Sequence, residues 1–341
     1  MRSLRLQLLP LLAAALVALT VTACGSDDDS GSGTVATAGG GDATATAPAD
    51  ASAFPVTIEN TLGSVTVEQA PERVVALDFA SADAALALGV TPVGMARVDY
   101  ADGGIQPWTK QALGDARPEL LDTSTGYPVE RVAALRPDVI LATNAYDLAD
   151  VYDELTQVAP VVAVEKGEGE DPWQLATERI GTALGKRQQA SELVERTEQA
   201  VADARRANPQ FEGKTVSFFN VVDRTAWAIN TPQDFSVKFL SDLGLVLSPT
   251  VARLRGTQGR AQLSAERYDL LDADVMIGTS PSPAELRAIA VDPLFERLPA
   301  VRDGRYVALP LSPATSMAFP SALSVQYGLE TIVPLLARAT S

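Results

Sequence analysis

The sequence has no histidine and only one cysteine, Cys24, among its 341 residues. The absence of histidine excludes His-ligated metal sites, Ser-His and Cys-His catalytic pairs, and any proton transfer by imidazole. A single cysteine permits neither an internal disulfide nor a cysteine-cluster metal site. Excess positive charge is also missing, since the formal net charge is -16. Nucleic acid is therefore excluded as a partner, because phosphate binding needs a basic surface.

The first two dozen residues have the pattern of an export signal. A basic start precedes an apolar run that ends at Leu19 and is too short for a comfortable membrane span. The residues at 21–24, Val-Thr-Ala-Cys, are similar to the bacterial lipobox, after which the cysteine is diacylated. We predict a lipoprotein signal peptide at 1–23 and lipidation of Cys24. The alternative is a plain signal peptide whose cysteine is incidental.

The next segment, 24–53, consists mainly of Asp, Gly, Ser, Thr and Ala and has almost nothing to bury. Such a composition does not offset the entropy lost on ordering, so we predict a flexible tether. The protein is then exported and lipid-anchored to the outer face of the cytoplasmic membrane.

The body of the chain alternates between short apolar runs and helical patterns. This alternation predicts mostly parallel sheets covered by helices. A β-hairpin is expected over 56–67. Further strands are expected at 73–77, 92–96, 138–143, 161–165, 215–222, 226–229, 274–278 and 306–309. Helices are expected at 81–88 with Ser81 as the cap, and at 128–135, 147–158, 235–243, 263–271, 284–290 and 321–338.

A long stretch without Gly or Pro, 186–207, has apolar residues at helical spacing. At 1.5 Å per residue such a helix is about 33 Å long, enough to cross a small domain. We predict an α/β fold of two Rossmann-like lobes joined by this single long helix. The lobes are predicted at 54–185 and 209–341, and the connecting helix at 186–208.

Six stretches in order resemble a known family. They are PERVVALD at 71–78, ALALGVTPVG at 85–94, VERVAALRPDVI at 129–140, LLDADV at 270–275, DPLFERLPAV at 292–301 and PSALSVQYGL at 320–329. Together they are similar to the class III substrate-binding lipoproteins of ABC importers for iron–siderophores and cobalamin. The resemblance covers the chain from about Phe54 to its end, and the last stretch is closer to the siderophore branch.

The resemblance implies a role for two glutamates, Glu130 and Glu266, each in the first turn of a predicted helix. In the family, one such glutamate on each lobe pairs with arginines of the two permease subunits. Two exposed carboxylates far apart are able to recognise a two-fold symmetric partner by charge. The alternative is that each acid only complements the dipole of its helix.

The resemblance also places the ligand in the cleft between the lobes. A ferric siderophore is bulky and often anionic, so arginines and aromatic faces suit it. The candidates are Arg97, Trp108, Tyr127, Tyr146, Arg224, Trp227, Arg253, Arg255, Met317 and Phe319, with Arg224 and Trp227 ranked highest. Packing is the alternative role for each aromatic residue. The loop 123–127 lacks the arginine that many siderophore binders carry there, which leaves the ligand's charge open.

The predicted function is therefore capture of a ferric siderophore and its delivery to an ABC permease with its ATPase. We expect a monomer with no catalytic residue, no resident metal and no cofactor, because iron arrives inside a chelator. Cobalamin or haem is the alternative cargo, although the lack of histidine disfavours His-ligated haem. An extracytoplasmic hydrolase or siderophore esterase, and an envelope lipoprotein without transport, are the alternatives from other classes.

Overall fold

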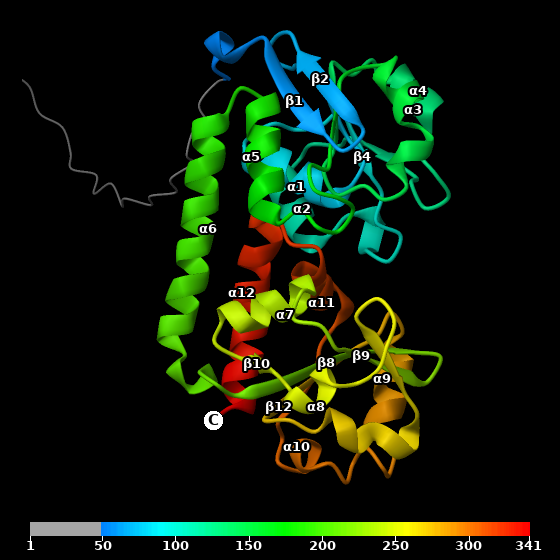
Figure 1. Cartoon of the computed structure of the whole chain (residues 1–341), viewed down its shortest axis with the longest axis vertical. Helices are drawn as coiled ribbons and strands as arrows, with labels where there is room; N and C mark the ends of the chain where they lie inside the picture. The colour runs from blue at the N-terminus through cyan, green and yellow to red at the C-terminus, as the bar shows by residue number, and fades with distance from the viewer. Residues whose placement is uncertain (1–48) are drawn as a thin grey trace, which may run out of the picture. The chain divides into compact units, whose positions relative to one another are not determined.

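The computed structural model describes residues 49–341, which belong to one compact unit (Figure 1). The predicted signal peptide, Cys24 and most of the predicted tether lie outside these residues. The end of the tether prediction is wrong, because Ala51–Ala53 form a 3-10 turn, η1, and the Asp50 N–H donates to the Gly185 carbonyl at 2.9 Å. Within 49–341, no helix has the length and apolar character that a membrane span requires.

The N-terminal lobe contains a hairpin and a five-stranded parallel sheet in the order β5-β4-β3-β6-β7. The strands are β1 (Val56–Asn60), β2 (Gly63–Val67), β3 (Val74–Ala76), β4 (Gly94–Ala96), β5 (Glu119–Leu121), β6 (Val139–Ala142) and β7 (Val161–Ala163). The helices are α1 (Phe79–Ala87), α2 (Pro107–Leu113), α3 (Val129–Ala134), α4 (Tyr152–Thr156) and α5 (Trp173–Ala183). The central strands β3 and β6 are wholly buried, as their continuous apolar runs predict.

One helix, α6 (Arg187–Ala207), leaves the first lobe and leads to the second. Its buried residues, Ala190, Val194 and Thr197, lie on one stripe, with charged residues around them. The predicted long helix is therefore confirmed.

The C-terminal lobe contains a six-stranded sheet in the order β11-β9-β8-β12-β13, with β10 also paired to β8. The strands are β8 (Thr215–Val222), β9 (Thr225–Ile229), β10 (Val246–Leu247), β11 (Arg260–Leu263), β12 (Val275–Thr279) and β13 (Tyr306–Ala308). The helices are α7 (Phe235–Asp242), α8 (Pro249–Ala252), α9 (Pro283–Ala290), α10 (Pro299–Arg302), α11 (Leu311–Ala318) and α12 (Ala322–Ala339). Pairing is parallel except along the β8–β9–β11 meander. The predicted fold class is confirmed.

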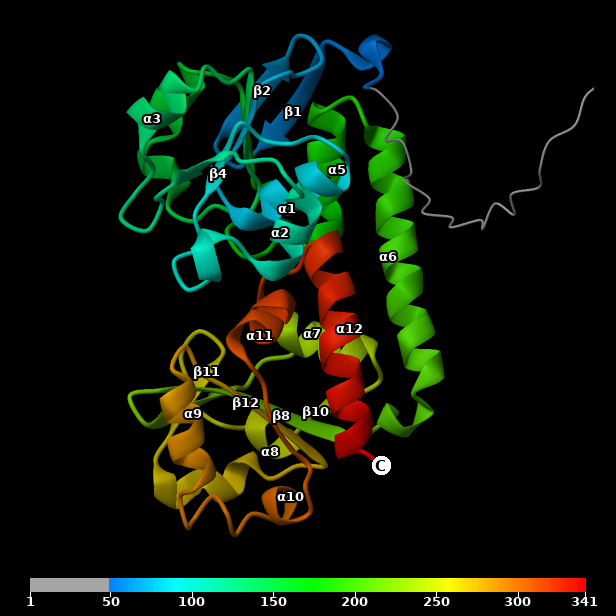
Figure 2. The same ribbon diagram turned by 180° about the vertical axis from the view of Figure 1, so that it is seen from behind.

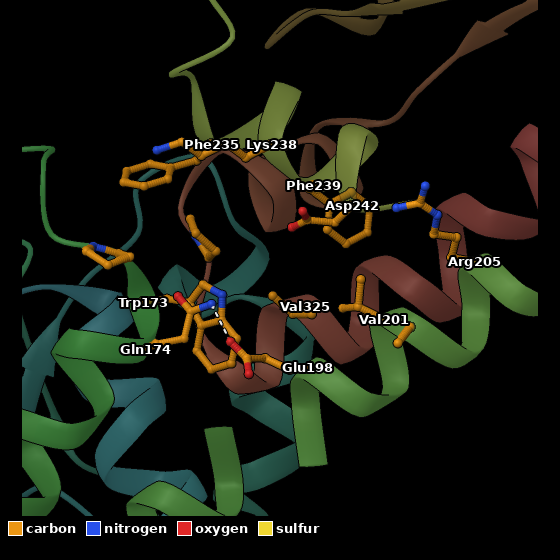
Figure 3. Close-up of a pocket in the computed structure, with 13 residues that line it drawn as sticks. Trp173, Gln174, Glu198, Val201, Arg205, Phe235, Lys238, Phe239, Asp242 and Val325 are labelled. Atoms are coloured by element: carbon orange, nitrogen blue, oxygen red, sulfur yellow. Dashed lines mark hydrogen bonds between the residues drawn. The ribbon is translucent and has the colours of Figure 1, made fainter. Parts of the chain in front are cut away.

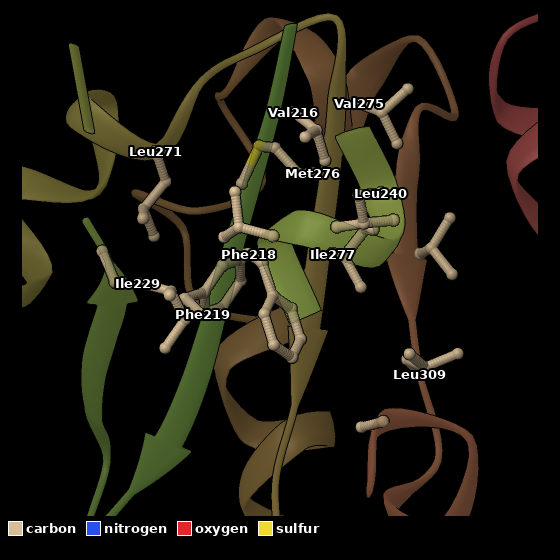
Figure 4. Packing of buried hydrophobic residues seen from close by; sticks show 14 of the residues in the cluster. Val216, Phe218, Phe219, Ile229, Leu240, Leu271, Val275, Met276, Ile277 and Leu309 are labelled. Carbon is tan, nitrogen blue, oxygen red and sulfur yellow. The ribbon is translucent and has the colours of Figure 1, made fainter. Parts of the chain in front are cut away.

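The two faces of the second sheet have different covers. The ring of Phe219 lies 6.1 Å from that of Phe295 and 6.3 Å from that of Tyr306, measured between centroids. The chain around Phe295 therefore covers the face of the sheet that carries Phe219. Because side chains alternate along a strand, Phe218 points to the opposite face. Figure 4 shows Phe218 and Leu240 of α7 in the same buried cluster. Along the vertical of Figures 1 and 2, α7 and α11 lie between this sheet and the first lobe.

The last helix, α12, contacts both lobes. Ile332 and Leu336 are fully buried in the core of the second lobe. At the other end of the helix, the Ser321 hydroxyl donates to Asp83 of α1. The lobe boundaries drawn from the sequence therefore stay a prediction, because the C-terminal segment packs on both sides.

Three local predictions are wrong. Asp78, not Ser81, caps α1: its carboxylate accepts the Ser81 N–H at 2.7 Å, and Ser81 lies inside the helix. The helix expected over 263–271 is the end of β11 followed by a 3-10 segment, η5 (Ala265–Leu271), with a non-helical Arg267. The helix expected over 147–158 is likewise broken into η3 (Leu148–Asp150) and α4.

Candidate functional site

A buried carboxylate organises the carboxyl edge of the first sheet. Asp78 follows β3 and accepts hydrogen bonds from Ser81 N, Ser81 Oγ and Asn144 N at 2.7, 2.7 and 3.1 Å. Ser81 Oγ also lies 2.9 Å from Thr143 Oγ1. Burial raises the pKa of Asp78, and these hydrogen bonds oppose the shift. The cluster fixes where the chain leaves β6 and begins the loop that carries Tyr146.

Tyr127 and Tyr146, predicted separately from the sequence, lie together. The Tyr127 hydroxyl donates to the Tyr146 carbonyl at 2.7 Å, and Tyr146 remains 48% exposed. Burial raises the pKa of Tyr127, and the negative charge of Asp78 raises it further. The pKa of Tyr146 is also raised, first by burial and then by the charge of Glu168. Both phenols therefore stay neutral, and the exposed Tyr146 hydroxyl is able to donate a hydrogen bond to a ligand.

Arg97 follows β4 on the same edge of the sheet. Its guanidinium is exposed but forms ion pairs with Asp99 at 2.7 Å and with Asp122 at 3.0 Å. The first lobe therefore presents no unpaired cation at this position, and Arg97 is already balanced by two acids.

On the second lobe, a strained turn displays Arg224. Asp223 and Arg224 have φ angles of +51° and +58° between the paired residues Val222 and Thr225. This is the geometry of a two-residue hairpin turn that normally favours Asn-Gly. Arg224 is exposed and has no ion pair within 49–341. A non-glycine residue in this conformation costs about 1 kcal/mol, and such strain clusters at functional sites.

Trp227 belongs to a row of side chains that crosses four strands. In register, Gln262 of β11 lies opposite Trp227 of β9, Trp227 opposite Asn220 of β8, and Asn220 opposite Thr279 of β12. All four point to the α7 and α11 side of the sheet, because Phe219 next to Asn220 points to the other side. We call these four residues the platform row. Trp227 and Asn220 are partly exposed, and the buried Thr279 hydroxyl has no hydrogen-bond partner.

Sequence reasoning missed Asn220, Gln262 and Thr279. Their common row depends on the pairing of β9 with β11, thirty residues apart, and the sequence pattern placed the start of a helix at the end of β11. The alternation within 215–222 did predict that Asn220 lies in a strand, but no local signal reveals its neighbours.

Arg253 and Arg255 lie near the other end of β9. Asn230, which follows β9, donates from Nδ2 to the Leu254 carbonyl at 2.7 Å and so ties their loop to the strand. Both arginines are exposed and have no ion pair among the described residues. The structure thus places Arg224 and the Arg253–Arg255 loop at opposite ends of the strand that carries Trp227.

Phe319, Trp108 and Met317 are placed differently from one another. Phe319 is half-buried and packs edge-on against Phe79 of the first lobe, with ring centroids 5.2 Å apart, so it lies where the lobes meet. Trp108 is buried and donates from Nε1 to Asp83 at 2.6 Å, and Met317 is fully buried in the second core. The latter two predictions are corrected, because neither side chain offers surface to a ligand in this structure.

The two glutamates predicted for docking are both exposed. Glu130 lies in the first turn of α3 and Glu266 in the first turn of η5. The pKa of Glu266 is lowered by a hydrogen bond from its own backbone N–H and by another from Ser264. Neither forms an ion pair within 49–341, so each carboxylate is available to a partner.

No group of three or more Asp, Glu, His or Cys side chains that could hold a metal ion occurs among the described residues. The arrangement offers instead neutral phenols on one lobe, and an indole, amides and unpaired arginines on the other. These groups are suited to holding an anionic organic molecule and supply neither a nucleophile–base pair nor a metal cage.

Comparison with known proteins agrees with this geometry. A family model described as "Periplasmic binding protein" matches residues 74–312. The Fe(3+) dicitrate-binding periplasmic protein FecB of Escherichia coli is 28% identical over 209 residues, which cover 59% of this chain and 65% of FecB, just under two thirds.

Two solved structures cover 84% of this chain. A periplasmic solute binding protein from Mycobacterium smegmatis superimposes with a TM-score of 0.72 at 30% identity, over 99% of that chain. PiaA of Streptococcus pneumoniae in complex with ferrichrome superimposes with a TM-score of 0.70 at 28% identity, over 98% of that chain. The family model spans well over half of the sequence, and its members are binding proteins, not enzymes. The chain therefore belongs to the periplasmic binding protein family.

Proposed function

We propose that this protein captures a ferric siderophore between its lobes and delivers it to an ABC permease. The observation that carries the proposal is the partly exposed Trp227 of the platform row, which lies on the strand that begins just after the unpaired, strained Arg224. The family supports it, as do the ligands named for relatives: ferric dicitrate for FecB and ferrichrome for PiaA.

We infer that the ligand is an anionic ferric chelate of the carboxylate type. Three exposed arginines near the two ends of β9, Arg224, Arg253 and Arg255, have no ion pair within 49–341. Guanidinium groups bind carboxylates through two parallel hydrogen bonds. The first lobe supplies neutral phenol donors, while its Arg97 is already balanced by Asp99 and Asp122. A neutral hydroxamate complex would leave the arginines without partners, so ferric citrate fits this chemistry better than ferrichrome.

Isothermal titration calorimetry of the mature protein tests the cargo. The titrants are ferric citrate, ferrichrome, ferrioxamine, a ferric catecholate, cobalamin and haem, each ferric complex also in iron-free form. We expect saturable binding of ferric citrate. Arg224→Ala should lower the affinity about 10-fold, which corresponds to about 1.4 kcal/mol of binding free energy. Arg302→Ala removes an exposed arginine of the same lobe and serves as the control. Binding of cobalamin or haem alone would overturn the assignment.

Delivery is proposed to depend on Glu130 and Glu266. Three observations support this role: both glutamates are exposed, neither forms an ion pair within 49–341, and one lies on each lobe. The double variant Glu130→Ala with Glu266→Ala should bind ligand normally yet abolish uptake of radioactive iron by cells. The matched double variant Glu195→Ala with Glu296→Ala removes two other exposed glutamates. Normal uptake by the first variant would contradict the docking role.

The proposed location is outside the cytoplasmic membrane, anchored through a lipid on Cys24. The lipobox-like sequence and the periplasmic binding protein family support export. Cells fed labelled palmitate should label the wild type and not Cys24→Ala, which should appear in the medium or periplasm. Equal labelling of the wild type and Cys24→Ala would contradict lipid anchoring through Cys24.

A further inference from the structure

A cavity of about 440 Å³ lies beside the connecting helix and is lined by none of the residues assigned above to the ligand site or to docking. We call it the hinge pocket. Its apolar walls come from Trp173 of α5, Val201 of α6, Phe235 of α7 and Val325 of α12. The volume falls in the range of small-molecule sites, which are mostly apolar with a few polar groups. Figure 3 shows Phe235, Lys238 and Asp242 on one side of the cavity, with Glu198, Val201 and Val325 on the other.

The two cations of the hinge pocket are already engaged. Arg205 donates three hydrogen bonds of 2.8–3.1 Å to Glu212. The Lys238 ammonium lies over the Phe235 ring, 5.0 Å from its centroid. Arg205 is therefore balanced by Glu212, whereas the ring contact leaves the charge of Lys238 in place.

The two acids of the hinge pocket are exposed to solvent and have fewer protein partners. Glu198 accepts one hydrogen bond, from Gln174 Nε2 at 3.0 Å, and Asp242 has no hydrogen bond or ion pair within 49–341. Burial raises the pKa of Asp242; the charges of Arg205 and Lys238 oppose the shift, and that of Glu198 adds to it. A positive charge placed between Glu198 and Asp242 would pair with both carboxylates, and the rings of Trp173 and Phe235 would favour it further.

We propose that the hinge pocket is a second binding site, which takes a small organic ammonium ion with an apolar body. Its occupancy is coupled to the inter-lobe site. The apolar body packs on Trp173, Phe235 and Val201, and the ammonium group pairs with Asp242 and Glu198.

We infer the coupling from the lobe to which each wall of the hinge pocket belongs. Trp173 begins α5, which packs within the first lobe, whereas Phe235 begins α7 on the second sheet. A molecule held by both walls therefore responds to any change in the angle between the lobes. On the α7 side, a methyl group placed on Gly328 of α12 would lie 3.2 Å from the Phe239 ring and 3.0 Å from Ser316 Oγ. Helices α7, α11 and α12 are thus in close contact, and α11 leads to Phe319 at the junction of the lobes.

The first experiment titrates phenethylamine into the mature protein by calorimetry and needs no ferric ligand. 2-Phenylethanol and phenylacetate, which are neutral and anionic analogues of similar shape, are the matched probes. We expect saturable binding of phenethylamine and binding at least about 10-fold weaker for both analogues.

Variants locate the binding. Asp242→Asn should weaken phenethylamine binding about 10-fold, whereas Glu195→Gln, a charge removal on α6 outside the pocket, should not change it. Ala202→Phe fills the cavity from α6 and should abolish binding while the thermal unfolding midpoint stays close to that of the wild type. Absence of saturable binding, or binding unaffected by Asp242→Asn and Ala202→Phe, would overturn the site.

The second experiment measures ferric citrate affinity with and without saturating phenethylamine, and it rests on the proposed function. We expect a change of about 5-fold or more in the wild type, and none in Ala202→Phe. Equal affinities in the wild type would overturn the coupling. A protein that binds phenethylamine but none of the ferric chelates would instead refute the proposed function and leave the hinge site standing.

Discussion

Asp83 and Ser321 are 238 residues apart, yet the Ser321 hydroxyl donates a 2.8 Å hydrogen bond to the Asp83 carboxylate across the junction of the lobes. The same carboxylate accepts from Trp108 Nε1 at 2.6 Å and from Thr109 Oγ1 at 2.5 Å. Asp83 is fully buried, and its side chain forms no ion pair with any residue in 49–341. A buried acid without a cation thus holds the N-terminal end of α12 against the first lobe.

The Ser321→Ala variant should lower the free energy of unfolding by about 2–4 kcal/mol. Ser321 caps α12 by accepting the Ser324 N–H at 3.0 Å, which contributes about 1 kcal/mol, and it also donates to a buried carboxylate, which contributes about 1.5–3 kcal/mol. Ser282→Ala removes only a cap, that of α9, and should cost about 1 kcal/mol or less. Urea denaturation measures both; equal losses would show that the inter-lobe hydrogen bond contributes nothing.

Stability should depend on pH through Asp83. Burial raises its pKa from 3.8 to about 6, so between these values the folded protein holds a proton that the unfolded chain has lost. The proton on Asp83 stabilises the folded protein fully below pH 4. This contribution to the free energy of unfolding, about 3 kcal/mol, is lost as the pH rises through 6.

Comparison with Asp83→Asn isolates this term, because all other titrating groups are shared. The unfolding free energy of the wild type relative to Asp83→Asn should be larger at pH 4.5 than at pH 7.5. Asp115→Asn, which removes an exposed carboxyl group, is the control substitution. A constant difference for Asp83→Asn would mean that Asp83 is ionised throughout.

Glycine at position 224 should separate stability from binding. Arg224 has a left-handed backbone, which glycine adopts without strain, so Arg224→Gly should raise the unfolding free energy by about 0.5–1 kcal/mol. The same change removes a guanidinium from the proposed ligand site and should weaken ferric citrate binding about 10-fold. Arg136, with φ +48°, is the matched control: Arg136→Gly should stabilise the protein without affecting binding. Unchanged binding by Arg224→Gly would exclude Arg224 from the site.

The sequence predicted elements well where local pattern and burial coincide. The span of β8 matches the structure at both ends, and α7 differs from its prediction only in its last residue. The predictions failed where a segment suits two local structures. Asp78 and Ser81 are both good caps, and the 3-10 segment η5 that follows Leu263 contains residues that also suit a helix.

The site was only partly predictable for a different reason. Tyr127, Tyr146, Arg224 and Trp227 were predicted because their residue types suit an anionic chelate, and their role stays a prediction. Whether a side chain faces a ligand or a core depends on tertiary packing, which buried Met317 and turned Trp108 toward Asp83. The platform row needs strand register between distant segments, and no pattern along one strand contains that information.

The most direct test of the central claim is an anomalous difference map at the iron edge, from crystals of the protein grown with ferric citrate. We expect one iron peak between the Tyr127–Tyr146 pair and the platform row, inside a chelate that lies on Trp227. A peak elsewhere, or no peak in crystals whose X-ray fluorescence shows bound iron, would contradict the proposed site.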